Sequence, residues 1–205
     1  MAHTMITRLT VGFTALAGAC TLGACGTSAP AASPAPAPVS SPAFVADSHS
    51  APSTSTPRCG TADLSVSLGT PKESSEYPGQ FDVPLVYRNI SAHDCGLYGV
   101  PGVDLVGPDD PNGPVYHLTR VDNGAPYNEV TPGTTATATI TVLSATPGSV
   151  GSNGSTRWIP ARVETIPPGQ TTALTAQWPS DVTVLRQDAA THPGSWVNGI
   201  LADPA

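Results

Sequence analysis

Apolar and threonine residues alternate strictly over residues 136–142, and this pattern limits the possible folds more than any other feature of the chain. The apolar positions are Ala136, Ala138, Ile140 and Val142, with threonine at each position between them. A two-residue period places the two sets of side chains on opposite faces of a β-strand, so this segment predicts a strand with one buried face. No ten-residue stretch has a convincing 3.6-residue period, and 11% of the residues are charged against a usual fraction of about 25%. Helix bundles, coiled coils and parallel βαβ folds are therefore disfavoured.

Similar short segments, rich in β-branched residues, recur between turn signals. They predict strands at residues 64–68, 83–87, 103–105, 115–121, 136–142, 158–166, 171–178, 182–185 and 196–201. Eight or nine strands of this length predict that residues 58–205 form one all-β domain, an antiparallel β-sandwich of immunoglobulin-like type.

Two Pro-Gly pairs, Pro132-Gly133 and Pro168-Gly169, each follow an apolar segment and precede a threonine-rich one. Proline suits the first central position of a type II turn, and glycine suits the second, which needs a positive φ. The two stretches therefore predict two equivalent corners of the sandwich.

Residues 1–24 have the pattern of an export signal peptide. Arg8 precedes an uncharged segment at residues 9–24 that is too short and too rich in glycine and alanine for a good membrane span. The stretch at residues 22–25, Leu-Gly-Ala-Cys, resembles the bacterial lipobox, which implies cleavage before Cys25 and a lipid thioether on its sulfur. Alternatives are an ordinary secretory signal with an incidental Cys25, a poorer lipobox ending at Cys20, and a start at Met5.

Residues 25–57 are expected to form a disordered linker after the lipidated cysteine. Of the 32 residues from 26 to 57, 26 are proline, alanine, serine or threonine, and this composition cannot bury enough apolar area to offset the chain entropy. Acyl chains on Cys25, at about 0.8 kcal/mol per buried CH₂, would hold the protein on the bilayer. We therefore expect a lipoprotein on the extracytoplasmic face of the bacterial cell membrane, with the bilayer as one partner.

The predicted location outside the cytoplasm assigns different roles to the four cysteines. Cys20 is removed with the signal peptide and Cys25 carries the lipid, which leaves Cys59 and Cys95 outside the cytoplasm. Two remaining thiols in an oxidising compartment are most simply a disulfide. No Cys-Xaa-Xaa-Cys motif is present, which argues against redox catalysis.

Three stretches of the predicted domain resemble a known family. They are Arg-Cys-Gly-Thr-Ala-Asp-Leu at residues 58–64, Val-Pro-Leu-Val-Tyr-Arg-Asn at 83–89 and Cys-Gly-Leu-Tyr-Gly-Val-Pro-Gly-Val at 95–103. These stretches resemble the actinobacterial DUF4232 family of secreted proteins and lipoproteins. The resemblance implies an extracytoplasmic, immunoglobulin-like sandwich and brings no activity with it, and it fades beyond about residue 175.

The sequence gives little support to nucleic-acid binding or hydrolysis. Lys72 is the single lysine and the exported form carries seven basic against fifteen acidic residues, so no basic patch is available for phosphates. No Gly-x-Ser-x-Gly motif occurs, and the serines of residues 149–155 lie in a Gly/Ser loop that we expect to be disordered. Among the pairs of carboxylates that hydrolysis would need, Asp109-Asp110 is explained more simply as part of a turn. We expect no catalysis and no cofactor.

Metal handling of the copper type, or hydrolysis in the envelope, remains as the alternative function. Both methionines, Met1 and Met5, leave with the signal peptide, so imidazole ligands would have to come from His93, His117 or His192. These histidines are far apart in sequence and lack a metal-binding spacing, so each is more simply a surface residue, and we expect no metal site.

The preferred function is binding or interaction in the cell envelope by a non-catalytic domain, with an envelope protein or a glycan as the unknown partner. Trp158, Trp178 and Trp196 are the candidate contact residues, with core packing as the alternative for each. The loops at residues 108–114 and 144–156 are natural recognition segments, because the loops of a sandwich cluster at its two ends.

Overall fold

The computed structural model describes residues 56–203 of the 205-residue chain. The predicted signal peptide at residues 1–24, the lipidation site Cys25 and all but the last two residues of the predicted linker at 25–57 lie outside the described residues. Within residues 56–203, no helix combines the length and apolar character that crossing a bilayer requires.

The described chain consists of strands and two short 3₁₀ helices. The helices are η1 (Thr61–Asp63) and η2 (Ser152–Gly154). The strands are β1 (Leu64–Leu68), β2 (Lys72–Glu73), β3 (Gln80–Asn89), β4 (Cys95–Leu97), β5 (Gly102–Val106), β6 (Val115–His117), β7 (Thr119–Val121), β8 (Asn128–Val130), β9 (Thr135–Leu143), β10 (Arg157–Trp158), β11 (Arg162–Ile166), β12 (Leu174–Gln177), β13 (Val184–Leu185), β14 (Trp196–Asn198) and β15 (Leu201–Ala202).

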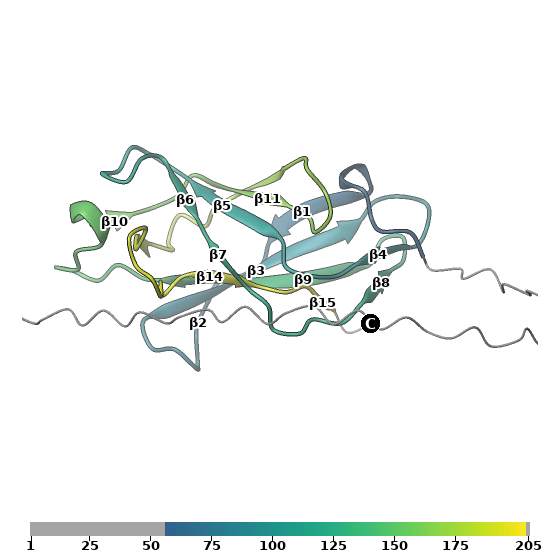
Figure 1. Cartoon of the computed structure of the whole chain (residues 1–205), viewed down its shortest axis with the longest axis horizontal. Coiled ribbons are helices and arrows are strands. Elements are labelled where there is room, and N and C mark those ends of the chain that lie inside the picture. Colours follow the sequence, from purple (N-terminus) through teal and green to yellow (C-terminus); the bar gives the residue numbers. More distant parts are fainter. Residues whose placement is uncertain (1–55, 204–205) are drawn as a thin grey trace, which may run out of the picture. The chain divides into compact units, whose positions relative to one another are not determined.

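Two sheets form the body of the domain (Figure 1). The larger sheet has the strand order β1-β3-β9-β14-β7, with β2 added to β3 and β15 added to β9, and the smaller sheet has the order β12-β11-β5-β6. Two further pairs, β10–β13 and β4–β8, stand apart from these sheets. The domain is an all-β sandwich, as the sequence predicts.

The alternating segment lies at the centre of the larger sheet. Strand β9 pairs antiparallel with β3 over nine residues, with Leu85 opposite Ala138. The apolar set of β9 is fully buried, whereas Thr137 and Thr139 are only partly buried on the other face. Facing strands of the smaller sheet contribute Leu105 and Val163, which are also inaccessible. The core therefore fills the space between the two sheets, on the face that the two-residue period indicates.

Both predicted Pro-Gly corners are present. Gly133 and Gly169 have φ values of 82° and 78°, and in each turn the amide after the glycine donates to the carbonyl before the proline. These bonds join Thr134 N to Thr131 O and Gln170 N to Pro167 O, both at 3.0 Å. The geometry is that of a type II turn, in which glycine relieves the cost of a positive φ.

The strands outnumber the eight or nine predicted, because some predicted segments divide and others were missed. The segment at residues 115–121 divides at Leu118, where the chain passes from β6, paired with β5, to β7, which runs parallel to β14 in the larger sheet. The segment at residues 158–166 divides near Pro160, which has no amide hydrogen to continue a ladder. Strands β2, β4 and β8 are only two or three residues long and have too few residues to show a period.

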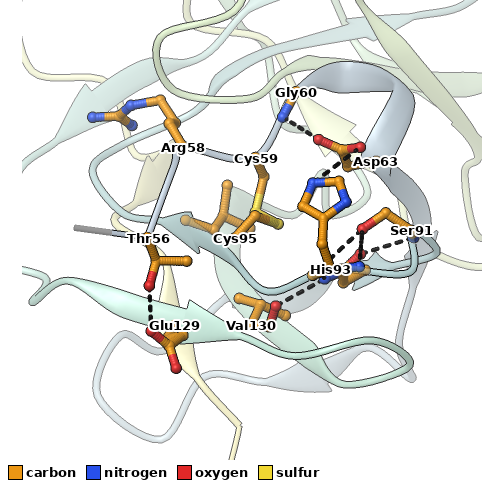
Figure 2. The surroundings of a disulfide bond; sticks show 12 residues. Thr56, Arg58, Cys59, Gly60, Asp63, Ser91, His93, Cys95, Glu129 and Val130 are labelled. Atoms are coloured by element: carbon orange, nitrogen blue, oxygen red, sulfur yellow. Dashed lines mark hydrogen bonds and ion pairs between the residues drawn. A yellow bond between two sulfur atoms is a disulfide. The ribbon is translucent and has the colours of Figure 1, made fainter. Parts of the chain in front are cut away.

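The predicted disulfide joins Cys59 to Cys95 (Figure 2). Both cysteines are buried, and the neighbouring backbone is paired as well, since Cys59 N donates to Gly96 O at 2.9 Å and Gly96 N donates to Pro57 O at 2.7 Å. The first described residues are thus fastened to β4 by a covalent bond and by backbone hydrogen bonds.

Candidate binding site

Two of the three predicted contact residues belong to the core. Trp158 and Trp178 are 3% and 6% exposed. Their indole N–H groups donate within the protein, from Trp158 to Pro108 O and from Trp178 to Val182 O, each at 3.0 Å. Because their rings are buried and their indole N–H groups are already hydrogen-bonded within the protein, these two side chains are core residues. Of the three predicted contact residues, only Trp196 remains a candidate.

Trp196 lies at the start of β14 on the outer face of the larger sheet. Its neighbour Val197 is fully buried, so the alternation of the strand turns Trp196 and Asn198 away from the core. The ring of Tyr77 lies against Trp196, with 5.3 Å between ring centroids and an interplanar angle of 89°. Tyr77 comes from the turn between β2 and β3, which places an aromatic side chain beside Trp196 from a segment more than a hundred residues earlier.

These two rings line a groove of about 510 Å³ on the outer face of the sheet. The other lining residues are polar with one exception: Ser74, Glu76, Asp82, Val121, Asn123, Thr139, Thr141 and Asn198. They come from the β2–β3 hairpin, from β7 and the loop after it, and from β9 and β14. Among these described lining residues there is no basic side chain.

Several polar atoms of the groove are held in place by neighbours. Thr141 donates its hydroxyl to Asp82 Oδ1 at 2.7 Å, and Asn123 Oδ1 accepts from Gly199 N at 3.0 Å, which leaves the amide NH₂ of Asn123 available. Tyr77 donates its hydroxyl to Glu76 Oε1 at 3.1 Å. This hydrogen bond and the negative charge of Glu76 raise the pKa of Tyr77. The tyrosine is therefore neutral and the carboxylates carry the charge of the groove.

Sequence reasoning missed most of this groove. Tyr77 precedes Pro78-Gly79, a pair that indicates a turn and gives no sign that the aromatic side chain covers a sheet. Thr139 lies on the face of β9 that the two-residue period turns away from the core, and Asp82 lies just before the predicted strand at residues 83–87. Neither position carried any indication of a site. The contact between Tyr77 of the β2–β3 turn and Trp196 of β14 is a tertiary relationship that no local sequence pattern indicates, because β9 separates β3 from β14 in the sheet.

The two predicted recognition loops meet each other, at the left of Figure 1. Asn112 Nδ2 donates to Ser152 O at 2.9 Å, and Ser155 Oγ donates to Asp110 Oδ2 at 2.6 Å. Ser155 is fully buried. The expectation of a disordered Gly/Ser loop is therefore wrong for its C-terminal part, because hydrogen bonds to the 108–114 loop fix it.

Arg186 holds these loops from the inside, and its guanidinium is completely buried. It forms ion pairs with Asp188 and, at 3.7 Å, with Asp110, and it donates to the carbonyls of Gly113 and Val115. Its Cζ atom also lies 4.8 Å from the centroid of the Trp158 ring. The planar guanidinium with five donors suits such a site, in which several acceptors converge. We regard this cluster as structural support for the loops, since its polar groups bind one another.

The three histidines that the alternative function required lie apart. His93 is 3.8 Å from Asp63 near the disulfide (Figure 2), His117 is 2.7 Å from Asp104 on the smaller sheet, and His192 contacts Thr191. Within residues 56–203, no group of three His, Cys, Asp or Glu side chains is placed to hold a metal ion.

The fold and the groove together define an all-β sandwich with an aromatic and polar surface site and a disulfide close to the first described residues. Residues 59–196 match the family model described as "Domain of unknown function (DUF4232)", and the chain belongs to this family. The resemblance seen in the sequence is thereby confirmed, and the match extends beyond residue 175, where the resemblance had faded. No curated protein and no solved structure matches the chain.

Proposed function

We propose that this protein is a lipid-anchored, extracytoplasmic binding protein of the bacterial envelope, with a non-catalytic DUF4232 domain that contacts its partner through the Tyr77–Trp196 groove. The observation that carries the binding role is the groove itself. It combines two aromatic rings with polar side chains on an outer sheet face, so one ligand can meet both an apolar surface and hydrogen-bonding groups there.

The proposed anchor is supported by the lipobox-like residues 22–25 and by the composition of residues 26–57. A linker of this composition reaches about 30 Å as a flexible coil and about 100 Å as polyproline II. Residues 56–58, where the linker meets the domain, lie at the end that carries β4 and β8, whereas the β2–β3 turn with Tyr77 lies toward the other end (Figure 1). This arrangement leaves the groove accessible when the domain is held by its N-terminal end.

The anchor is tested by membrane fractionation and by mass spectrometry of the mature N-terminus. Wild-type protein should partition with the membrane and carry diacylglycerol on Cys25, and Cys25→Ser should lose both properties. Cys20→Ser is the matched control and should leave them unchanged. An unmodified Cys25 in the membrane fraction of the native host would overturn the anchor.

The contact surface is tested by photocrosslinking in the native host. A photoreactive amino acid at Val121, which lines the groove and is exposed, should give a discrete crosslinked envelope component. The same probe at Ile90, an exposed apolar residue outside the groove, is the control and should not give that product. Identical products from both positions, or none from Val121, would argue against the groove as the contact site.

A further inference from the structure

We propose that the Tyr77–Trp196 groove binds a neutral oligosaccharide segment of an envelope glycan. This inference rests on the proposed binding function and specifies its ligand. It follows from three properties of the groove: the arrangement of its aromatic rings, the hydrogen-bonding groups beside them, and its charge.

The aromatic rings supply an apolar surface in a polar setting. A pyranose ring has C–H groups on one face, and the electron-rich face of an aromatic ring attracts them. The rings of Tyr77 and Trp196 are nearly perpendicular, so they form an edge-to-face pair and not a face-to-face stack. Tyr77 is 43% exposed, which leaves ring area for such contact.

The polar residues offer both donors and acceptors. Within the described chain, no protein acceptor takes the indole N–H of Trp196, in contrast to the indoles of Trp158 and Trp178. The NH₂ group of Asn123 and the amide of Asn198 add donors, and Asp82 retains a carboxylate oxygen that Thr141 does not occupy. Sugar hydroxyls both donate and accept, so they match such a mixed set better than a purely anionic or purely apolar ligand does.

The charge of the groove favours a neutral ligand. Glu76 and Asp82 would repel phosphate, sulfate or uronate groups, and the described lining residues include no basic side chain. Lys72 lies directly opposite Asp82 in the β2–β3 pair and shares its face of the sheet, so it partly offsets the charge of Asp82 for anionic and cationic ligands alike. The groove is therefore only weakly acidic, which disfavours anions and gives a cation little to bind.

The test uses residues 26–205 produced in an oxidising compartment, which retains every described residue and the disulfide. Enzymatic fragments of the host's envelope polysaccharides are separated into neutral and acidic pools, and each pool is titrated while the three indole signals are followed by ¹⁵N NMR. Neutral fragments should shift the Trp196 signal, assigned with Trp196→Phe, and leave the buried Trp158 and Trp178 signals in place.

Variants then locate the binding. Tyr77→Ala and Asn198→Ala should each weaken the binding of neutral fragments, Tyr77→Ala by about tenfold, the effect of losing a central aromatic contact. Tyr127→Ala is the matched control, since Tyr127 is 49% exposed but outside the groove, and it should bind within twofold of the wild type. Unchanged affinity in Tyr77→Ala would overturn the proposal.

The remaining outcomes separate the ligand from the general function. Preferential binding of acidic fragments overturns the neutral-glycan proposal. The proposal also fails if no fragment binds while the probe at Val121 captures an envelope protein, but the proposed binding function then stands. If deletion of residues 26–49 alone shifts the Trp196 signal, the occupant is the chain's own proline-rich linker and the proposal is wrong. Failure of both the titration and the crosslinking removes the binding function as well.

Discussion

The hydroxyl groups of Tyr87 and Thr165 are 2.5 Å apart in the interior, where they connect the larger sheet to the smaller one. Thr165 donates to Gly102 O at 3.0 Å, so Tyr87 donates to Thr165. Burial raises the pKa of Tyr87, and the hydrogen bond to Thr165 only partly counteracts this. The phenol is therefore neutral at physiological pH and remains a hydrogen-bond donor.

Removing the Tyr87 hydroxyl and removing the Thr165 hydroxyl should each destabilise the domain, but by different amounts. Tyr87→Phe removes the donor but leaves Thr165 bonded to Gly102, so we expect a loss of about 1 kcal/mol. Thr165→Val leaves the buried Tyr87 hydroxyl and the Gly102 carbonyl without this partner and should cost about 1–3 kcal/mol. Chemical denaturation of both single variants and the double variant measures the coupling. Purely additive losses would show that the two hydroxyls do not depend on each other.

The disulfide should contribute strongly to stability. Closing the loop between Cys59 and Cys95, 36 residues apart, is worth about 4 kcal/mol in the chain-entropy model. The double variant Cys59→Ala/Cys95→Ala should therefore unfold at a markedly lower denaturant concentration. Reducing agent should lower the stability of the wild type and leave the variant unchanged. Recovery of both cysteines as free thiols in peptide mapping of the native protein would contradict this prediction.

Arg186→Met should destabilise the domain and loosen the loops around it. The substitution leaves Asp110, Asp188 and the converging carbonyls without their cation, and breaking a buried ion pair costs about 3–5 kcal/mol. Denaturation should show this loss, and hydrogen exchange should accelerate at residues 108–114 and 151–156. Arg162→Met is the control, because its ion pair with Glu164 is partly exposed and worth about 0–1 kcal/mol. Equal effects of the two variants would disprove a special role for Arg186.

Asp110 should make stability depend on acid pH. Burial alone would raise its pKa, but hydrogen bonds from Ser155 and Asn112 and the charge of Arg186 outweigh burial, so the pKa lies below its ordinary 3.8. A depressed pKa gives stability that is complete above the unfolded value and is lost as pH falls through the folded value. Asp110→Asn should therefore flatten the decline of stability below about pH 4. The measurement is denaturation at a series of pH values, with Asp109→Asn as the control.

Gly169 should tolerate alanine less well than Gly133. Both have a positive φ, which costs any residue with a Cβ about 1 kcal/mol. A Cβ at Gly169 would also lie 2.8 Å from Cδ of Arg58, whereas at Gly133 the nearest atom is 3.8 Å away. Arg58 cannot yield freely, since its Cζ atom lies 3.8 Å from the centroid of the Tyr98 ring and it donates to Pro168 O. Thermal unfolding of the two variants should rank them in this order, and the reverse order would refute the argument.

The sequence predicted the features of this fold that depend on local patterns. The two-residue period of β9 identified both the strand and its buried face, and the Pro-Gly pairs identified two corners. The parallel pairing of β7 with β14 could not be predicted, because it depends on the chain changing sheets at Leu118. The short strands β4 and β8 were missed for a similar reason, since the disulfide and backbone pairing around Cys95 define them rather than any periodicity.

The site was less accessible to prediction. Trp196 could be named as a candidate because exposed tryptophans are uncommon and often functional, but nothing in the sequence separated it from Trp158 and Trp178. Trp196 is accessible because Val197, and not Trp196, is the residue of β14 that faces the core. Nothing in the sequence indicated that Arg186 is buried, because an arginine after a strand usually lies in solvent. Its burial is explained only by the carbonyls and carboxylates that converge on it from distant parts of the chain.

The fastening of residues 57–59 to β4 has a mechanical consequence. If the linker holds the domain to a surface, any pull on the linker first reaches the fold at residues 57–59, whose backbone is hydrogen-bonded to Gly96, and at the disulfide of Cys59. The disulfide passes this load directly to β4 and shields β1 from being peeled off β3. Stretching a single molecule from its N-terminus should therefore rupture the reduced protein at lower force than the oxidised one.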